Sequence, residues 1–156
     1  MHSIFQKIKD ALIPEAQPVK PAIPDGQHAI AALLVRAARA SEVYDDRQVA
    51  QIDAVLARRF GLPMPEADAL RLRAAEFEER TGDTVHLTRA IKDIIPLDDR
   101  PALLEDLWRV ILADGGRHEN EDGLMRLVSN LLGLADRDSA FARQKIMARK
   151  AAMADD

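Results

Sequence analysis

The apolar residues of this chain recur at intervals of three and four along most of its length. In one well-patterned stretch the apolar face is formed by Ile30, Leu33, Leu34, Ala37 and Ala38. This spacing places side chains on a single face of an α-helix, whereas no segment of strand length alternates between apolar and polar residues. The pattern therefore predicts an all-α fold, a single compact domain of about seven helices joined by short connections.

Capping residues predict where several of these helices begin and end. Asp25 precedes the first domain helix, where its carboxylate can accept a hydrogen bond from a free backbone amide. Gly61 and Gly133 each follow an apolar helical stretch, where a left-handed residue commonly ends a helix. Asp136 opens the last predicted helix. That helix runs through Phe141, Ile146 and Met147 to a polar end.

Proline content divides the chain into three parts. Residues 1–24 are expected to form an N-terminal amphipathic helix followed by a proline-rich linker, because Pro14, Pro18, Pro21 and Pro24 fall within a short stretch. Residues 25–150 form the predicted helical domain, and residues 151–156 a frayed tail. Two interpretations of the N-terminal helix stay open: it folds back on the domain, or it anchors the protein on a partner or a membrane surface.

Two parts of the sequence resemble each other in pattern. Residues 52–62 align with residues 124–134, and both end in a Gly-Leu pair. Each follows a short polar loop that is itself preceded by an amphipathic helix. This internal repeat predicts two helix-loop-helix units related by a pseudo-twofold axis, with their loops in related environments.

Composition excludes several classes of function. The chain has a formal net charge of −4, which argues against a nucleic-acid partner because such proteins need a basic face. It has no cysteine, so disulfides, thiolate metal sites and cysteine nucleophiles are excluded. The apolar run 29–35 is far too short to span a bilayer. A cytoplasmic location is the expectation.

The loop of the second unit concentrates residues that bind cations. Asp114, His118 and Glu121 lie within it, beside Gly115. The arrangement resembles the latter half of a calcium-binding EF-hand loop, but Val110 and Leu112 would occupy the first ligand positions and cannot bind a cation.

Mixed carboxylate and imidazole ligands remain compatible with Ca²⁺, Mn²⁺ or Zn²⁺, and with Fe²⁺. His118 and Glu121 are spaced to share one helix face, as a metal pair requires. The first loop would contribute Glu42 and Asp45 if the repeat brings the two loops together. The alternative is that these acidic residues only cap and stabilise helix N-termini.

Sequence motifs for catalysis are absent. His118-Glu119 is not followed by the second histidine of a zinc-protease motif, and no phosphate-binding glycine loop or nucleophile elbow is present. The main hypothesis is therefore a non-enzymatic cytoplasmic binding module. Two alternatives remain: a metal-dependent enzyme that uses the carboxylate and histidine cluster, and a purely structural adaptor.

The stretch 107–115, continuing through 118–121 to 131–138, resembles the C-terminal half of the tellurite-resistance TerB-like family. The stretch 37–62 resembles the N-terminal half, so the resemblance covers about residues 26–148. It implies an all-helical domain with two related halves and an acidic surface proposed to bind a metal. It also implies a stress-related binding or scaffolding role near the membrane.

Carried onto this sequence, the resemblance places Asp114, His118 and Glu121 in the acidic motif of the second half and Asp45 in that of the first. The chain departs from the family at Ser41-Glu42, where the family tends to have Asp-Gly. The resulting expectation is a divalent metal cofactor and a protein partner, associated with the membrane in one version. A homodimer is a further arrangement left open.

Overall fold

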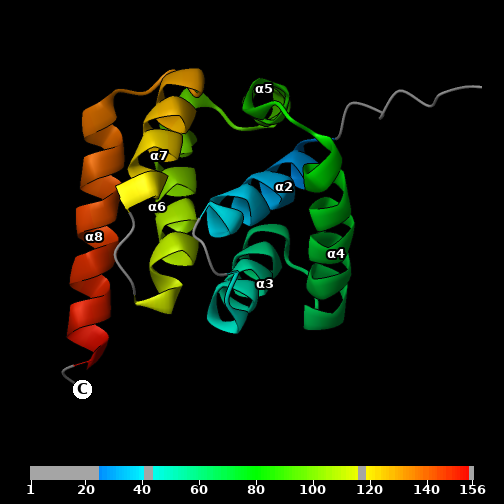
Figure 1. Ribbon diagram of the computed structural model, residues 1–156, viewed down its shortest axis with the longest axis horizontal. Helices are drawn as coiled ribbons and strands as arrows, with labels where there is room; N and C mark the ends of the chain where they lie inside the picture. Colours follow the sequence, from blue (N-terminus) through cyan, green and yellow to red (C-terminus); the bar gives the residue numbers. More distant parts are fainter. Residues whose placement is uncertain (1–24, 41–43, 116–118, 155–156) are drawn as a thin grey trace, which may run out of the picture.

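The computed structural model describes residues 25–40, 44–115 and 119–154, which form seven α-helices and two 3₁₀ turns without a strand (Figure 1). The α-helices are α2 (Gly26–Arg39), α3 (Asp46–Phe60), α4 (Met64–Arg80), α5 (Thr84–Ile94), α6 (Arg100–Ile111), α7 (Glu119–Leu131) and α8 (Asp136–Ala154). The 3₁₀ turns are η1 (Leu97–Asp99) and η2 (Leu112–Asp114). The predicted all-α fold is confirmed. The helix and linker predicted for residues 1–24 lie outside the described residues.

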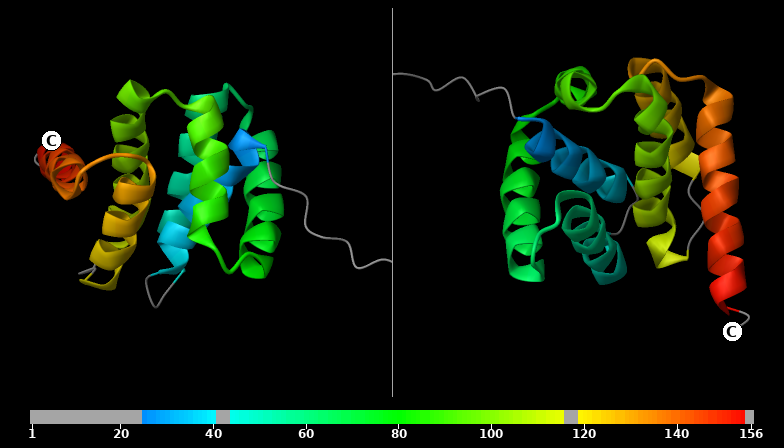
Figure 2. Two further views of the ribbon diagram at one scale, coloured as in Figure 1. Left: turned by 90° about the horizontal axis from the view of Figure 1, so that it is seen from above. Right: turned by 180° about the vertical axis from the view of Figure 1, so that it is seen from behind.

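Helix α2 is the centre of the domain. It packs against α3, α4, α5 and α6, which surround it (Figures 1 and 2). Alanines make up much of its surface, so neighbouring helices approach closely. Asp25 caps its N-terminus as predicted, since its Oδ1 accepts a hydrogen bond from the amide of His28 at 2.8 Å.

Helix α6 is the corresponding buried helix of the second half. It contacts α2, α3, α7 and α8. Its fully or nearly fully buried apolar residues are Leu103, Leu104, Leu107, Trp108, Val110 and Ile111. The first helix of each predicted unit is thus a core helix, and the two core helices touch. No described helix has the length and apolar character needed to cross a membrane.

The second helices of the two units, α3 and α7, are followed by the same turn. Gly61 and Gly133 adopt positive φ values of 61° and 77°. After each glycine, a leucine amide donates back to the preceding helix: Leu62 to the carbonyl of Ala57 at 3.1 Å, and Leu134 to that of Ser129 at 2.8 Å. Both are Schellman motifs, in which the left-handed glycine lets the chain reverse. The repeat seen in the sequence therefore encodes a shared local structure.

Replacing Gly61 with alanine is expected to lower the free energy of unfolding by about 1 kcal/mol, because a Cβ is disfavoured in the left-handed region. A Cβ at this position would meet no atom within 4 Å, so backbone conformation alone sets the cost. Gly82→Ala is the matched control, since Gly82 has equally open surroundings without a positive φ. Urea denaturation would measure both variants. Equal stabilities would contradict the prediction.

Helix α8 buries less than the sequence predicts. Only Ser139, Ala142 and Ile146 are buried, and they pack toward α6. Of the three apolar residues that mark this helix in the sequence only Ile146 is buried, since Phe141 is 62% exposed and Met147 is 50% exposed. The inward face of α8 is narrow because only one row of its residues, spaced three and four positions apart, contacts α6.

Candidate functional site

The first candidate site residue, Asp45, caps the N-terminus of α3. Its Oδ1 accepts a hydrogen bond from the amide of Arg47 at 2.7 Å, and the side chain of Gln48 accepts one from the amide of Asp45 at 3.2 Å. This reciprocal arrangement is a capping box. The helix-capping interpretation of this acidic residue is therefore present in the structure. A metal ligand at Asp45 would have to share the carboxylate with the cap.

Arg47 occupies the space in front of that carboxylate. Its Nε lies 3.1 Å from Oδ1 of Asp45, and its Nη2 lies 3.0 Å from Oδ2. The hydrogen bonds from the Arg47 side chain, followed by the one from its amide, hold the pKa of Asp45 below its usual value. The pKa of Arg47 is raised, first by its hydrogen bond to Asp45 and in smaller part by the negative charge of Asp114.

Asp114 reaches this place because α6 continues into η2. The turn ends at Gly115, whose φ of 76° is left-handed, and α3 packs against η2. Asp114 is partly buried. The structure therefore brings the predicted ligands Asp45 and Asp114 to the same region, with Arg47 influenced by both.

A buried carboxylate fixes α3 against α6. Asp106 of α6 is 1% exposed and accepts hydrogen bonds from Arg58 and Arg59 of α3 and from Arg109 of α6. The Arg59 Nε and Arg109 Nη1 distances are both 2.6 Å. Because α3 and α6 carry the two halves of the candidate site, this cluster sets their relative position.

The remaining predicted ligands are distributed differently. Glu121, near the start of α7, is buried with 2% exposure. Glu42 and His118 lie outside the described residues. Within residues 25–40, 44–115 and 119–154, no group of three or more histidine, aspartate or glutamate side chains is placed to hold a metal ion. The described part of the site consequently fits a metal only in part.

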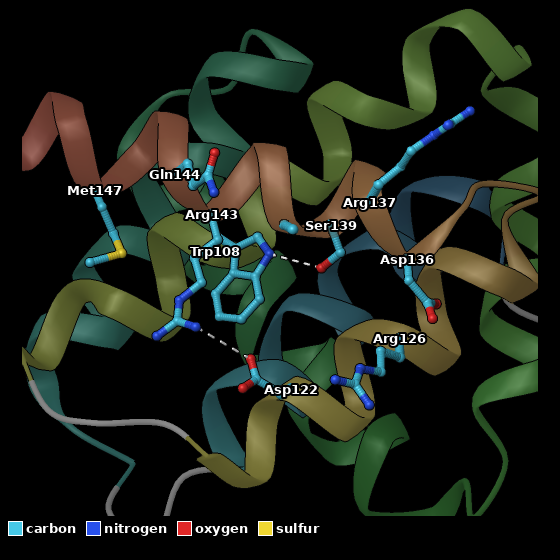
Figure 3. Close-up of a pocket in the computed structure, with 10 residues that line it drawn as sticks. Trp108, Asp122, Arg126, Asp136, Arg137, Ser139, Arg143, Gln144 and Met147 are labelled. Carbon is cyan, nitrogen blue, oxygen red and sulfur yellow. Dashed lines mark hydrogen bonds and ion pairs between the residues drawn. The ribbon is translucent and has the colours of Figure 1, made fainter.

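A groove of about 620 Å³ adjoins α7 on the side that faces α8 (Figure 3). Arg143 of α8 lies between two of its neighbours there: its guanidinium carbon is 5.4 Å from the centre of the Trp108 ring, and its Nη1 is 3.7 Å from Oδ1 of Asp122. Trp108 donates a hydrogen bond from Nε1 to Ser139 at 3.1 Å. The indole is only 2% exposed, so it is part of the core rather than a surface for a ligand.

The sequence interpretation missed the basic residues beside the acidic ones. It treated the first loop as acidic and left out Arg47. Arg47 lies two residues after Asp45, a spacing at which its side chain can reach the carboxylate of an N-cap residue. That spacing was the available signal. Arg109 lies three residues after Asp106, so its contact also had a local signal, whereas Arg58 and Arg59 had none because they are far from Asp106 in the sequence.

Comparison with known proteins gives one match. A search of curated proteins and a search of solved structures each found none. A family model described as tellurite resistance protein TerB matches residues 27–144, most of the chain and nearly all of the helical domain. The matched range includes both candidate loops and the two core helices. The chain belongs to the TerB family of tellurite resistance proteins.

Proposed function

We propose that this protein is a non-enzymatic binding module whose acidic face engages a cation. That face is defined here by Asp45 and Asp114, to which the predicted ligands Glu42, His118 and Glu121 would add. The ligand is a divalent metal ion, a basic side chain of a partner protein, or both in one complex. The proposal places the module in the cytoplasm.

One observation carries the proposal. Arg47 already acts as an internal cation for this face: it binds Asp45 through two nitrogens, and its pKa is raised by Asp45 and by Asp114. The two carboxylates come from two halves of the domain, which are in contact where α3 packs against η2. A partner's lysine or arginine would interact with the same oxygens in the same way.

Arg47 also sets a condition on metal binding. Its side chain is 64% exposed, so it can rotate into solvent without leaving a buried charge. A divalent ion would displace it from Asp45, and the protein's contribution would be to hold the acidic oxygens in place.

If the acidic face binds a metal ion, removing Arg47 should strengthen that binding. In Arg47→Gln, Ca²⁺, Mn²⁺ or Zn²⁺ should raise the melting temperature more than in the unmodified protein, because the competing cation is gone. An ion at about one hundred times its Kd would stabilise the folded state by about 2.7 kcal/mol. Thermal unfolding followed by circular dichroism, with and without each chloride salt, would measure the shift.

The matched variants use asparagine. Asp45→Asn/Asp114→Asn should abolish the shift, and asparagine caps a helix as well as aspartate, so α3 keeps its N-terminus. Asp98→Asn/Asp99→Asn, on the exposed turn η1, removes equal charge elsewhere and should leave the shift intact. Metal binding at this face would be contradicted by either of two results. One is a melting-temperature shift that persists in Asp45→Asn/Asp114→Asn; the other is the lack of any shift in Arg47→Gln with all three ions.

A further inference from the structure

A second groove, of about 550 Å³, lies on the part of the domain where α3 and α8 flank α6. Figures 1 and 2 show α6 between these two helices, and α6 contacts both. Four cationic residues line the groove: Arg47, Arg109, Arg149 and Lys150. None of the described aspartates or glutamates lines it. This basic groove contrasts with the chain as a whole, whose net charge is −4.

The positive charge of the basic groove is only partly neutralised within the fold. Arg47 is paired with Asp45, and Arg109 shares the single carboxylate of Asp106 with two other arginines. Arg149 is 51% exposed and lies 3.8 Å from Glu105, which also pairs with Lys145 at 3.3 Å. Lys150 donates to the carbonyl oxygen of Leu112, a neutral partner. Donors and charge therefore remain for an external anionic group.

The inner surface of the basic groove is apolar. Ala50, Ala113 and Ile146 line it between the cationic residues, and Met153, 77% exposed, extends the apolar surface at one end. The alanines leave room close to the helix backbones. An occupant that fits this surface has an apolar stripe flanked by carboxylates.

We infer that the basic groove binds an acidic amphipathic helix of a partner protein. The concave surface suits another helix, which would place its apolar stripe on Ala50 and Met153 and its carboxylates against Arg149 and Lys150. A flat anionic membrane could not reach the inner apolar surface of a groove. A nucleic-acid backbone has charge but no apolar stripe to match it.

The test uses the full-length protein and a fluorescein-labelled synthetic peptide, an amphipathic helix of leucine and glutamate. Its control is the same peptide with glutamine in place of glutamate. Fluorescence anisotropy should show binding of the glutamate peptide and clearly weaker binding of the glutamine peptide. Added NaCl should weaken the interaction, since exposed charge pairs are screened.

Variants locate the site. Arg149→Gln/Lys150→Gln lies on an exposed turn of α8 and should weaken binding about tenfold, because each exposed charge pair contributes up to a few-fold. Arg126→Gln/Arg137→Gln, also exposed, removes equal charge from the other groove, the one between α7 and α8, and should leave the affinity unchanged.

Four outcomes of the peptide and vesicle measurements overturn the inference. They are no binding of the glutamate peptide, equal binding of both peptides, equal effects of the two double variants, and binding to phosphatidylglycerol vesicles but not to the peptide. A concentration-dependent dimer in sedimentation that Arg149→Gln/Lys150→Gln abolishes would assign the groove to a second copy of the chain and equally overturn it. The Asp45→Asn/Asp114→Asn variant separates this inference from the metal proposal, because it leaves the groove cations in place.

Discussion

Replacing Asp106 with alanine is expected to lower the free energy of unfolding by about 3 kcal/mol. The carboxylate is 1% exposed and is the shared acceptor of Arg58, Arg59 and Arg109. Removing it leaves three guanidinium groups close together without their anion. Their side chains are 57%, 17% and 26% exposed, so water compensates part of the loss, which keeps the value at the low end for a broken buried pair.

Urea denaturation followed by circular dichroism measures this loss as a lower midpoint at an unchanged slope. Arg58→Gln is the matched control: it removes the most exposed of the three partners and should cost less than about 1 kcal/mol. Asp106→Asn should cost less than the alanine variant, since its amide oxygen still accepts from a guanidinium group although the negative charge and the second acceptor oxygen are lost. A loss below about 1 kcal/mol in Asp106→Ala would show that the cluster does not hold α3 on α6.

The same variant links stability to both binding surfaces. Asp106 fixes the α3–α6 contact, which brings Arg47 to Asp114 on one side and lines the basic groove with Arg47 and Arg109 on the other. We therefore expect Asp106→Ala to weaken metal and peptide binding together, whereas the double variants designed above should each affect one.

Local signals in the sequence predicted the helices and many of their ends. Asp25, Gly61 and Gly133 act through hydrogen bonds to residues within a turn or so of themselves, so the sequence around them contains the whole interaction. The all-α fold follows from spacing in the same way. The start of α6 differs: the 3₁₀ turn η1 leads into the helix, and Asp99, the residue before it, makes no side-chain cap hydrogen bond.

Tertiary relations account for what the sequence did not predict. Whether Phe141 faces inward depends on which row of α8 meets α6, and the helical spacing alone does not fix that choice. In the candidate site too, local signals predicted some features and tertiary contacts determined the others. The internal repeat predicted that the loops carrying Asp45 and Asp114 come together. Their shared partner Arg47 depends on α3 packing against η2, which is a contact between the two halves.

Replacing Trp108 with alanine is the second large effect we expect, a loss of about 3 to 5 kcal/mol in the free energy of unfolding. The indole is 2% exposed and lies where α6, α7 and α8 meet, as Figure 3 shows. Its loss opens a cavity and also removes the acceptor ring of Arg143 and the hydrogen bond to Ser139. Because α8 buries only Ser139, Ala142 and Ile146, it depends heavily on this contact.

Hydrogen exchange would therefore show the amides of α8 losing protection first in Trp108→Ala, before those of α2. Trp108→Phe keeps most of the ring but leaves the Ser139 hydroxyl, on a residue 5% exposed, without its partner. The double variant Trp108→Phe/Ser139→Ala should then lose less free energy of unfolding than the sum of the losses in the two single variants. The expected coupling is about 0.5 to 1.5 kcal/mol. Strict additivity would mean that the hydrogen bond adds nothing to the packing of the ring, and uniform loss of protection across α2 and α8 would mean that α8 is not a separately held element.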